Sequence, residues 1–161
     1  MKDIYKKQVA LLIDILIEIS KEDNFALHGG TAINLFHLSM PRLSVDIDLT
    51  FVPFSDNRND DLDKIRWSLE SVKNRLKTTF PNIRFEDEKR AEEELKLLCT
   101  KDNATVKVEV NQINRGLIAP TCTKILCNRA EEEFDRFCEI KTVSVGQLWG
   151  GKLNAALERQ H

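Results

Sequence analysis

Hydrophobic side chains near the N-terminus recur every three to four positions, which is the spacing of one face of an α-helix. Residues 3–22 place Leu12 and Leu16 on this face, and Asp14 and Glu18 on the other. The pattern predicts a first helix whose apolar face packs inward. The most hydrophobic part, residues 9–19, is interrupted by Asp14 and Glu18 and is too short for a membrane span, which needs roughly 20 apolar residues.

Two later stretches also have helical spacing. Residues 59–79 carry leucine, isoleucine and valine at intervals of three and four, which predicts a long amphipathic helix. A final helix is predicted over residues 144–161, with Ser144 at the start of a capping box. Gly150 and Gly151 lower the stability of this helix by roughly 1 kcal/mol each, so we expect close packing or a kink there.

Two segments alternate between apolar and polar residues, as a strand with one buried face does. Residues 44–51 place Asp46 and Asp48 on the polar face, and residues 105–111 place Glu109 there. Shorter strands are predicted at residues 25–28, 83–85, 95–99, 121–126 and 139–143, with a hairpin turn at 101–103. This order of elements predicts an α/β (α+β) domain whose mixed, mostly antiparallel sheet of about five strands is flanked by the first, long and last helices.

Composition narrows the classes of protein that this chain can be. Its 161 residues suit a single domain, and 42% apolar with 31% charged residues are ordinary for a folded globular protein. The net charge of −2 gives no overall basic field, so nucleic-acid binding would need a local basic patch. The four cysteines form no C-x-x-C pair, which predicts free thiols in the cytoplasm rather than a zinc site.

The paired aspartates are the strongest chemical feature. Asp46 and Asp48 lie two positions apart on one predicted strand, so their backbones are roughly 6–7 Å apart and their side chains point the same way. Such close charges repel unless a divalent cation neutralises them, and carboxylates favour magnesium or manganese. If the strand of Glu109 lies alongside, three acids can hold two ions, which supports nucleotidyl transfer.

A glycine turn precedes this acidic strand. Gly29, Gly30 and Thr31 follow the strand predicted at 25–28 and begin a short helix over 31–38. Glycines let phosphate groups approach backbone amides, and a helix N-terminus favours negative charge. Thr31 adds a hydroxyl donor. The turn is therefore predicted to bind the triphosphate of a nucleotide beside the metal-binding acids.

Each feature also has a plainer explanation. A glycine pair often only relieves steric crowding, and acids on a strand are often simply solvated. Glu109 beside Lys107 could be an ordinary surface residue. His28 and His37 have no partner at a diagnostic spacing, so we interpret them as a strand-end and a helix residue. The order and spacing of the turn and the acids favour the functional interpretation.

Three segments resemble a known family. Residues 28–32 (HGGTA) and 42–49 (RLSVDIDL) resemble the AbiEii/AbiGii-type nucleotidyltransferase toxins, which belong to the DNA polymerase β nucleotidyltransferase superfamily. Residues 107–109 (KVE) resemble the Lys-x-Glu strand of the same family. The resemblance implies a nucleotidyltransferase fold and activity. It also implies that residues 1–161 are an N-terminal catalytic domain that lacks the C-terminal helical region of the family.

The resemblance implies further nucleotide contacts. Arg42 and Ser44 match the family pattern and are expected to contact phosphate or to support the aspartates, although Arg42 could equally form an ion pair with one of them. Lys107 is expected to bind nucleotide. In the last helix, Lys152 matches a basic residue of the family, alongside Ala156 and Arg159, and is expected to meet the triphosphate unless it is an ordinary solvated lysine.

The predicted reaction moves a nucleoside monophosphate from an NTP to a hydroxyl. Asp46 and Asp48 would bind magnesium or manganese, and Glu109 would hold a metal or activate the acceptor. The resemblance implies an RNA acceptor, such as the tRNA 3′ end, and a toxin restrained by a cognate antitoxin. Two alternatives stay open: transfer to a small molecule such as an aminoglycoside, and a non-catalytic truncated homologue that acts as a binding module.

Overall fold

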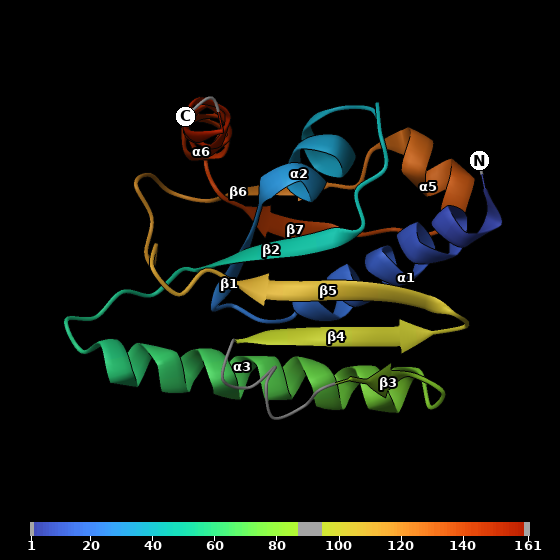
Figure 1. Ribbon diagram of the computed structural model, residues 1–161, viewed down its shortest axis with the longest axis horizontal. Coiled ribbons are helices and arrows are strands. Elements are labelled where there is room, and N and C mark those ends of the chain that lie inside the picture. Colours follow the sequence, from blue (N-terminus) through green and yellow to red (C-terminus); the bar gives the residue numbers. More distant parts are fainter. Residues whose placement is uncertain (1, 87–94, 160–161) are drawn as a thin grey trace.

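The computed structural model describes residues 2–86 and 95–159 of the chain. In chain order the elements are α1 (Asp3–Ile19), β1 (Phe25–His28), α2 (Gly29–Ala32), the π-helical turn η1 (Ile33–His37), β2 (Asp46–Phe51), α3 (Arg58–Thr79), β3 (Arg84–Phe85), β4 (Lys96–Lys101), β5 (Ala104–Val110), β6 (Cys122–Ile125), α5 (Asn128–Phe134), β7 (Glu139–Thr142) and α6 (Val145–Glu158). The strands form one sheet with helices packed against it (Figure 1).

The sheet is mixed and mostly antiparallel, as the sequence predicts. Its strand order is β3-β4-β5-β2-β1-β7-β6. The β1–β2, β3–β4, β4–β5 and β6–β7 pairs are antiparallel, whereas β2–β5 and β1–β7 are parallel. The sheet has seven strands instead of about five, because every predicted strand, including the short ones at the edges, joins the same sheet.

The hairpin between β4 and β5 is present as its sequence predicts, with a turn one residue shorter than the predicted 101–103. Lys101 pairs with Ala104, which leaves Asp102 and Asn103 as the two loop residues. Their φ angles are 51° and 65°. A two-residue type I′ turn requires positive φ at both positions, and aspartate and asparagine tolerate this conformation better than most side chains. The turn therefore fixes the register of β5 against β4.

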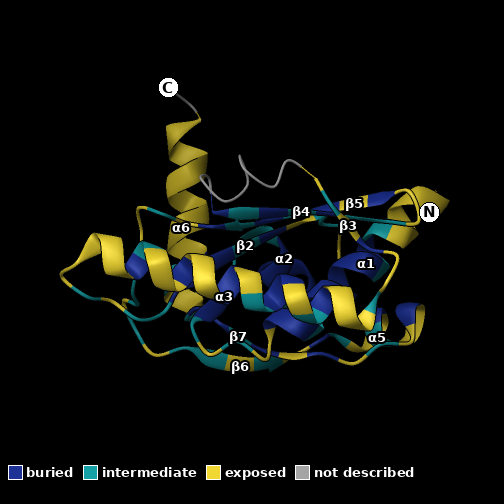
Figure 2. Cartoon of the chain, turned by 90° about the horizontal axis from the view of Figure 1, so that it is seen from below, coloured by how far each residue is buried: buried dark blue, intermediate teal, exposed yellow. Residues whose placement is uncertain are grey.

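One face of the sheet forms the core and the other carries the polar residues. Ile47 of β2 and Val106 and Val108 of β5 are fully buried on the face that α1 covers. Side chains alternate along a strand, so the acidic residues of β2 and β5 lie on the opposite face. Figure 2 shows α3 running along the core side, with its buried residues turned toward the sheet.

The polar face of α1 differs from the prediction. Asp14 and Glu18 lie opposite the apolar stripe in the sequence pattern, yet both are buried. Arg136 donates from Nε and Nη2 to the two carboxylate oxygens of Asp14, at 2.5 and 3.1 Å. Lys21 Nζ lies 2.9 Å from Glu18 Oε2, and Arg75 Nε lies 3.7 Å away. Burial is tolerated because each carboxylate is paired.

Two helices near the C-terminus also differ from expectation. The seven-residue α5 is absent from the predicted elements, because so short a segment shows little periodicity. The last helix, α6, is present and continues through Gly150 and Gly151. It projects from the body of the domain (Figure 2), contacts α2 and buries only Leu148, so it does not cover the sheet as the long helix does.

The four cysteines are free thiols, as the sequence predicts. Cys99 and Cys138 are buried, and burial raises the pKa of each thiol to about 12. Both behave as small hydrophobic residues of the core. Among the helices of the described residues, none is long and apolar enough to cross a membrane.

A buried ion pair attaches the loop after β5 to α3. The side chain of Asp61 is fully buried and accepts hydrogen bonds from the amide and hydroxyl of Ser55, at 3.2 and 2.8 Å, and from Arg115. Burial alone would raise the pKa of Asp61, but the two Ser55 hydrogen bonds and the charge of Arg115 outweigh it and lower this pKa. The pair fixes the segment that begins at residue 111.

We predict that Asp61→Asn lowers the free energy of unfolding by about 3–5 kcal/mol, because it leaves the Arg115 guanidinium buried without a counterion. Urea denaturation at pH 7 measures the loss. Since the native pKa of Asp61 is below its unfolded-state value, the difference from wild type should be complete above about pH 4 and shrink as the pH falls further. Equal stability of the two proteins at pH 7 would contradict the structural role of this pair.

Candidate active site

The pairing of β2 with β5 brings the predicted acids together. The two strands are parallel, with Asp46 opposite Lys107 and Asp48 opposite Glu109. Neighbouring strands lie about 4.8 Å apart, and residues in register share a face. All four charged side chains therefore lie on the polar face of the sheet. The acid that the sequence places 61 positions after Asp48 is its direct neighbour in space.

This arrangement perturbs Asp48. Burial raises the pKa of its carboxyl group, and the negative charges of Asp46 and Glu109 raise it further, while Lys107 and His28 partly offset the effect. An ionised Asp48 is thus surrounded by too little positive charge in the protein alone. A site with this deficit favours a bound cation.

Lys107 occupies part of the same charge cluster. Its Nζ lies 2.9 Å from Glu109 Oε2, and the hydrogen bond to Glu109, together with the charges of all three acids, raises the pKa of Lys107 despite partial burial. Both side chains of this pair are more than a third exposed, so the pair itself contributes little, about 0–1 kcal/mol. The ammonium group can be displaced from Glu109 at small cost.

The acids suit a hard divalent cation in their chemistry and in the face they share. In residues 2–86 and 95–159, however, no three His, Cys, Asp or Glu side chains are gathered closely enough to hold a metal ion. Glu109 is instead directed to Lys107. A metal held by Asp46, Asp48 and Glu109 together would require the Glu109 carboxylate to leave this ion pair, and the three-acid site stays a prediction.

The glycine turn lies against the acidic strand. Gly29 has a φ of +73°, in the left-handed region. A Cβ at this position would lie 2.6 Å from Asp48 Oδ2, closer than any real Cβ contact. Glycine is therefore required both by the backbone conformation and by the approach of the carboxylate. The predicted phosphate turn and the predicted metal ligand are in direct contact.

Thr31 connects the turn to the beginning of β2. Its hydroxyl donates to the main-chain carbonyl of Asp46 and forms a 2.7 Å hydrogen bond with the hydroxyl of Ser44. The side chain is only 1% exposed. In this structure Thr31 fixes the turn relative to the aspartates, and its predicted contact with phosphate stays a prediction.

Arg42 and Ser44 lie beside the second glycine. Arg42 Nη2 is 3.8 Å, and Ser44 Oγ 3.7 Å, from the position that a Cβ on Gly30 would take. Within the described residues Arg42 forms no ion pair with Asp46 or Asp48. The guanidinium group is therefore next to the turn and is not neutralised by the aspartates. A contact with phosphate would require both conditions.

Two adjoining cavities open in front of the acids. One, of about 450 Å³, is lined by Asp48, Glu109 and residues of the following loop. The second, of about 480 Å³, lies between that loop and α6. Both are lined by His28, Asn111 and Ile113. Their sizes are within the range of small-molecule sites, roughly 300–1,000 Å³.

His28 belongs to this cleft, although its sequence context indicates only a strand end. Its Nε2 is buried without a hydrogen-bond partner and lies 3.3 Å from the position of a Cβ on Gly151. The close packing expected at Gly150 and Gly151 is therefore found at Gly151, as a contact with this imidazole, whereas a Cβ on Gly150 would meet nothing within 4 Å. In the sequence, only the position of His28 next to the glycine turn could have indicated that it belongs to the site. Its contact with α6 could not be predicted, because it joins residues far apart in the chain.

The structure does not bring Lys152 to the acids. Lys152 Nζ lies over the ring of Trp149, 5.4 Å from its centroid, and Lys152 is absent from the residues that line either cavity. Gln147, Gly151 and Asn154 of α6 line the second cavity instead. A role for Lys152 at the triphosphate remains a prediction from the resemblance.

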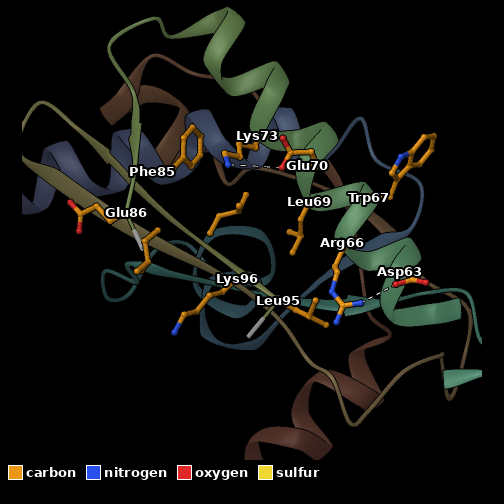
Figure 3. Close-up of a pocket in the computed structure, with 12 residues that line it drawn as sticks. Asp63, Arg66, Trp67, Leu69, Glu70, Lys73, Phe85, Glu86, Leu95 and Lys96 are labelled. Atoms are coloured by element: carbon orange, nitrogen blue, oxygen red, sulfur yellow. Dashed lines mark hydrogen bonds and ion pairs between the residues drawn. The ribbon is translucent and has the colours of Figure 1, made fainter. Parts of the chain in front are cut away.

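A more apolar pocket of about 370 Å³ lies elsewhere, between α3 and β4 (Figure 3). Leu97 lines it and pairs with Val108, so this wall faces the core side of the sheet, opposite to Glu109. Two pairs of its charged residues are engaged with one another, Arg66 with Asp63 at 3.0 Å and Lys73 with Glu70 at 4.0 Å. The pocket therefore has the shape of a binding site without the chemistry of the acidic cluster.

A comparison with protein families agrees with this geometry. The family model described as the nucleotidyl transferase AbiEii toxin of a type IV toxin–antitoxin system matches residues 10–161. The match covers the glycine turn, all three acids and α6. No curated protein and no solved structure matches the chain.

We predict that Gly29→Ala lowers the free energy of unfolding by at least about 1–2 kcal/mol, because alanine is strained in the left-handed region and its Cβ displaces Asp48. Urea denaturation measures this. The matched control is Gly146→Ala, since a Cβ at Gly146 meets nothing within 4 Å and alanine favours the helix by about 0.5–1 kcal/mol. A Gly29 variant as stable as the wild type would show that the turn is not held against Asp48.

We also predict that Asp48→Asn stabilises the free protein at pH 7. A native pKa raised above the unfolded-state value means that ionisation of Asp48 opposes folding. The stability of the wild type should therefore decline relative to the variant as the pH rises from about 4 through the native pKa, and the two should converge in acid. Thermal denaturation of both proteins between about pH 3 and about pH 8 measures this difference. A variant that is less stable than the wild type at pH 7 would contradict the prediction.

Proposed function

This chain belongs to the AbiEii nucleotidyl transferase toxin family, and from that premise we propose that it transfers a nucleoside monophosphate from an NTP to a hydroxyl of RNA in a magnesium-dependent reaction. The family comprises toxins of type IV toxin–antitoxin systems, which implies a cognate antitoxin. The family match does not specify the nucleotide, the metal ion or the RNA acceptor, and these three are our proposal. Manganese can replace magnesium at such a site.

The observation that supports this function best is the convergence of three elements. β2 supplies two acids, β5 supplies Glu109 beside Asp48, and Gly29 touches Asp48 from the other side. A nucleoside triphosphate needs metal-binding oxygens and a phosphate-binding turn next to each other. No local sequence feature alone would produce this combination on one polar face.

Each residue has a distinct part in the proposed reaction. Divalent ions, when bound at Asp46 and Asp48, would neutralise the triphosphate and favour the ionised acceptor hydroxyl. The glycine turn would orient the phosphates. The acceptor oxygen would form a bond to the α-phosphorus as the bond to pyrophosphate breaks, and Glu109, once released from Lys107, would accept the hydroxyl proton.

The cleft supports a large acceptor. The cavity beside the acids continues into the cavity along α6, so a nucleotide and the end of a polymer can be bound next to each other. Amide side chains line the second cavity, from Asn111, Gln147 and Asn154. These groups can hydrogen-bond to sugar hydroxyls, phosphates and unpaired bases, which is how proteins recognise single-stranded RNA ends. The tRNA 3′ end is the acceptor that we propose.

We predict that Asp46→Asn lowers the transfer rate by roughly a thousandfold or more, because metal-assisted charge stabilisation contributes several kcal/mol to such reactions. The measurement is incorporation of labelled nucleotide into purified tRNA with magnesium present. The variant keeps the size and shape of the side chain, so its circular dichroism and thermal transition should match those of a folded protein. Removal of the metal with EDTA should abolish incorporation by the wild type.

The same assay separates the alternatives. Labelling of small hydroxyl compounds such as aminoglycosides, with no labelling of tRNA, would replace RNA as the acceptor. Nucleotide and magnesium binding without incorporation into either class would indicate a non-catalytic binding module. Incorporation that persists at the wild-type rate in Asp46→Asn or in EDTA would refute the assignment of the acids.

A further inference from the structure

A buried amide group lies beneath the glycine turn without a partner. Asn34, in η1, is only 3% exposed, and its Nδ2 has no hydrogen-bond partner in the structure. Buried donors in native proteins are nearly always paired, so an exception calls for an explanation. The cost of burying this donor is recovered if a ligand supplies the acceptor.

The unpaired nitrogen faces the second glycine. Asn34 Nδ2 lies 3.9 Å from the position that a Cβ on Gly30 would take. Arg42 Nη2 and Ser44 Oγ lie 3.8 and 3.7 Å from the same point. Three polar groups, from η1 and the segment before β2, thus border the space beside Gly30, where a Cβ would lie at ordinary contact distances from each of them.

The surrounding charge specifies the kind of ligand. Arg42 is permanently charged, and its guanidinium group matches a phosphate. The Asn34 amide nitrogen is a donor only. A cation would be repelled here by Arg42, whereas a phosphate oxygen would accept from both nitrogens. Asp48, with its raised pKa, lies at the neighbouring Gly29, so the space adjoins the acidic cluster without being part of it.

We infer that Asn34 is a phosphate-binding residue that donates, together with Arg42, to one phosphate group of the incoming nucleotide at Gly30. This inference rests on the proposed function and extends it, because Asn34 belongs to neither of the motifs at residues 28–32 and 42–49. Asn34 lies three residues after Thr31, in a π-helical segment, and this conformation is frequent at functional sites.

The test compares binding with stability. Asn34→Leu removes the donor and keeps the branched shape of the side chain, and we expect it to weaken binding of tripolyphosphate with magnesium by about 10- to 100-fold, the usual effect of losing a hydrogen bond to a charged group. Isothermal titration calorimetry measures this with tripolyphosphate and with NTP. The free variant should stay folded, because removal of an unpaired buried donor offsets the cost of the larger leucine side chain.

Three further variants keep the test decisive. Asn34→Asp places a negative charge in the same position and should weaken binding more than leucine does, even if the leucine variant folds poorly. Gly30→Ala fills the space, at ordinary contact distances, and should weaken binding without unfolding the protein. Asn24→Leu is the matched control: Asn24 Nδ2 donates to Ser68 Oγ at 2.9 Å, away from the turn, so its loss should lower stability and leave binding unchanged.

The outcomes separate this inference from the proposed function. Wild-type affinity in Asn34→Leu and Asn34→Asp, with transfer still abolished by Asp46→Asn, would overturn the role of Asn34 alone. A folded Asn34→Leu variant that loses stability as Asn24→Leu does, and binds normally, would show that the amide is merely structural. Absence of any magnesium-dependent binding of NTP or tripolyphosphate by the wild type would overturn both proposals together.

Discussion

Parallel pairing of β2 with β5 places Asp48 beside Glu109 on one face of the sheet, and the site follows from the electrostatic cost of that contact. Burial and neighbouring negative charge raise the pKa of Asp48, while Lys107 engages Glu109 in an ion pair. The lysine compensates part of the charge in the free protein. Because the pair is partly exposed, it stabilises the cluster only weakly and leaves room for a stronger cation.

The glycine turn lets the backbone come close to the same acidic cluster. Gly29 approaches the Asp48 carboxylate more closely than any other residue could, and Thr31 fixes this approach through the carbonyl of Asp46. The polar groups around Gly30 then lie beside the aspartates but outside their pairings. The acidic cluster at Gly29 and the polar groups at Gly30 therefore adjoin at consecutive residues of the turn.

The walls of the cleft depend on contacts that lie outside the cluster. The buried Asp61–Arg115 pair attaches the loop after β5 to α3, and the contact of His28 with Gly151 places α6 across the second cavity. Most of α6 is exposed and only Leu148 is buried. Its position therefore depends on few contacts, and the fit of the glycine against the imidazole is one of them.

Local periodicity in the sequence was enough to predict α1, α3, α6 and the alternating strands β2 and β5, and the sequence also predicted a hairpin turn before β5. It placed each acid on the polar face of its strand, since alternation needs no partner. Only the packed fold shows which strands are neighbours, that Asp14 and Glu18 are buried against Arg136, Lys21 and Arg75, that His28 and Arg115 line the cleft, and that Asn34 lies near Gly30. These depend on pairings between residues up to 122 positions apart, whose geometry is fixed only when the whole core packs.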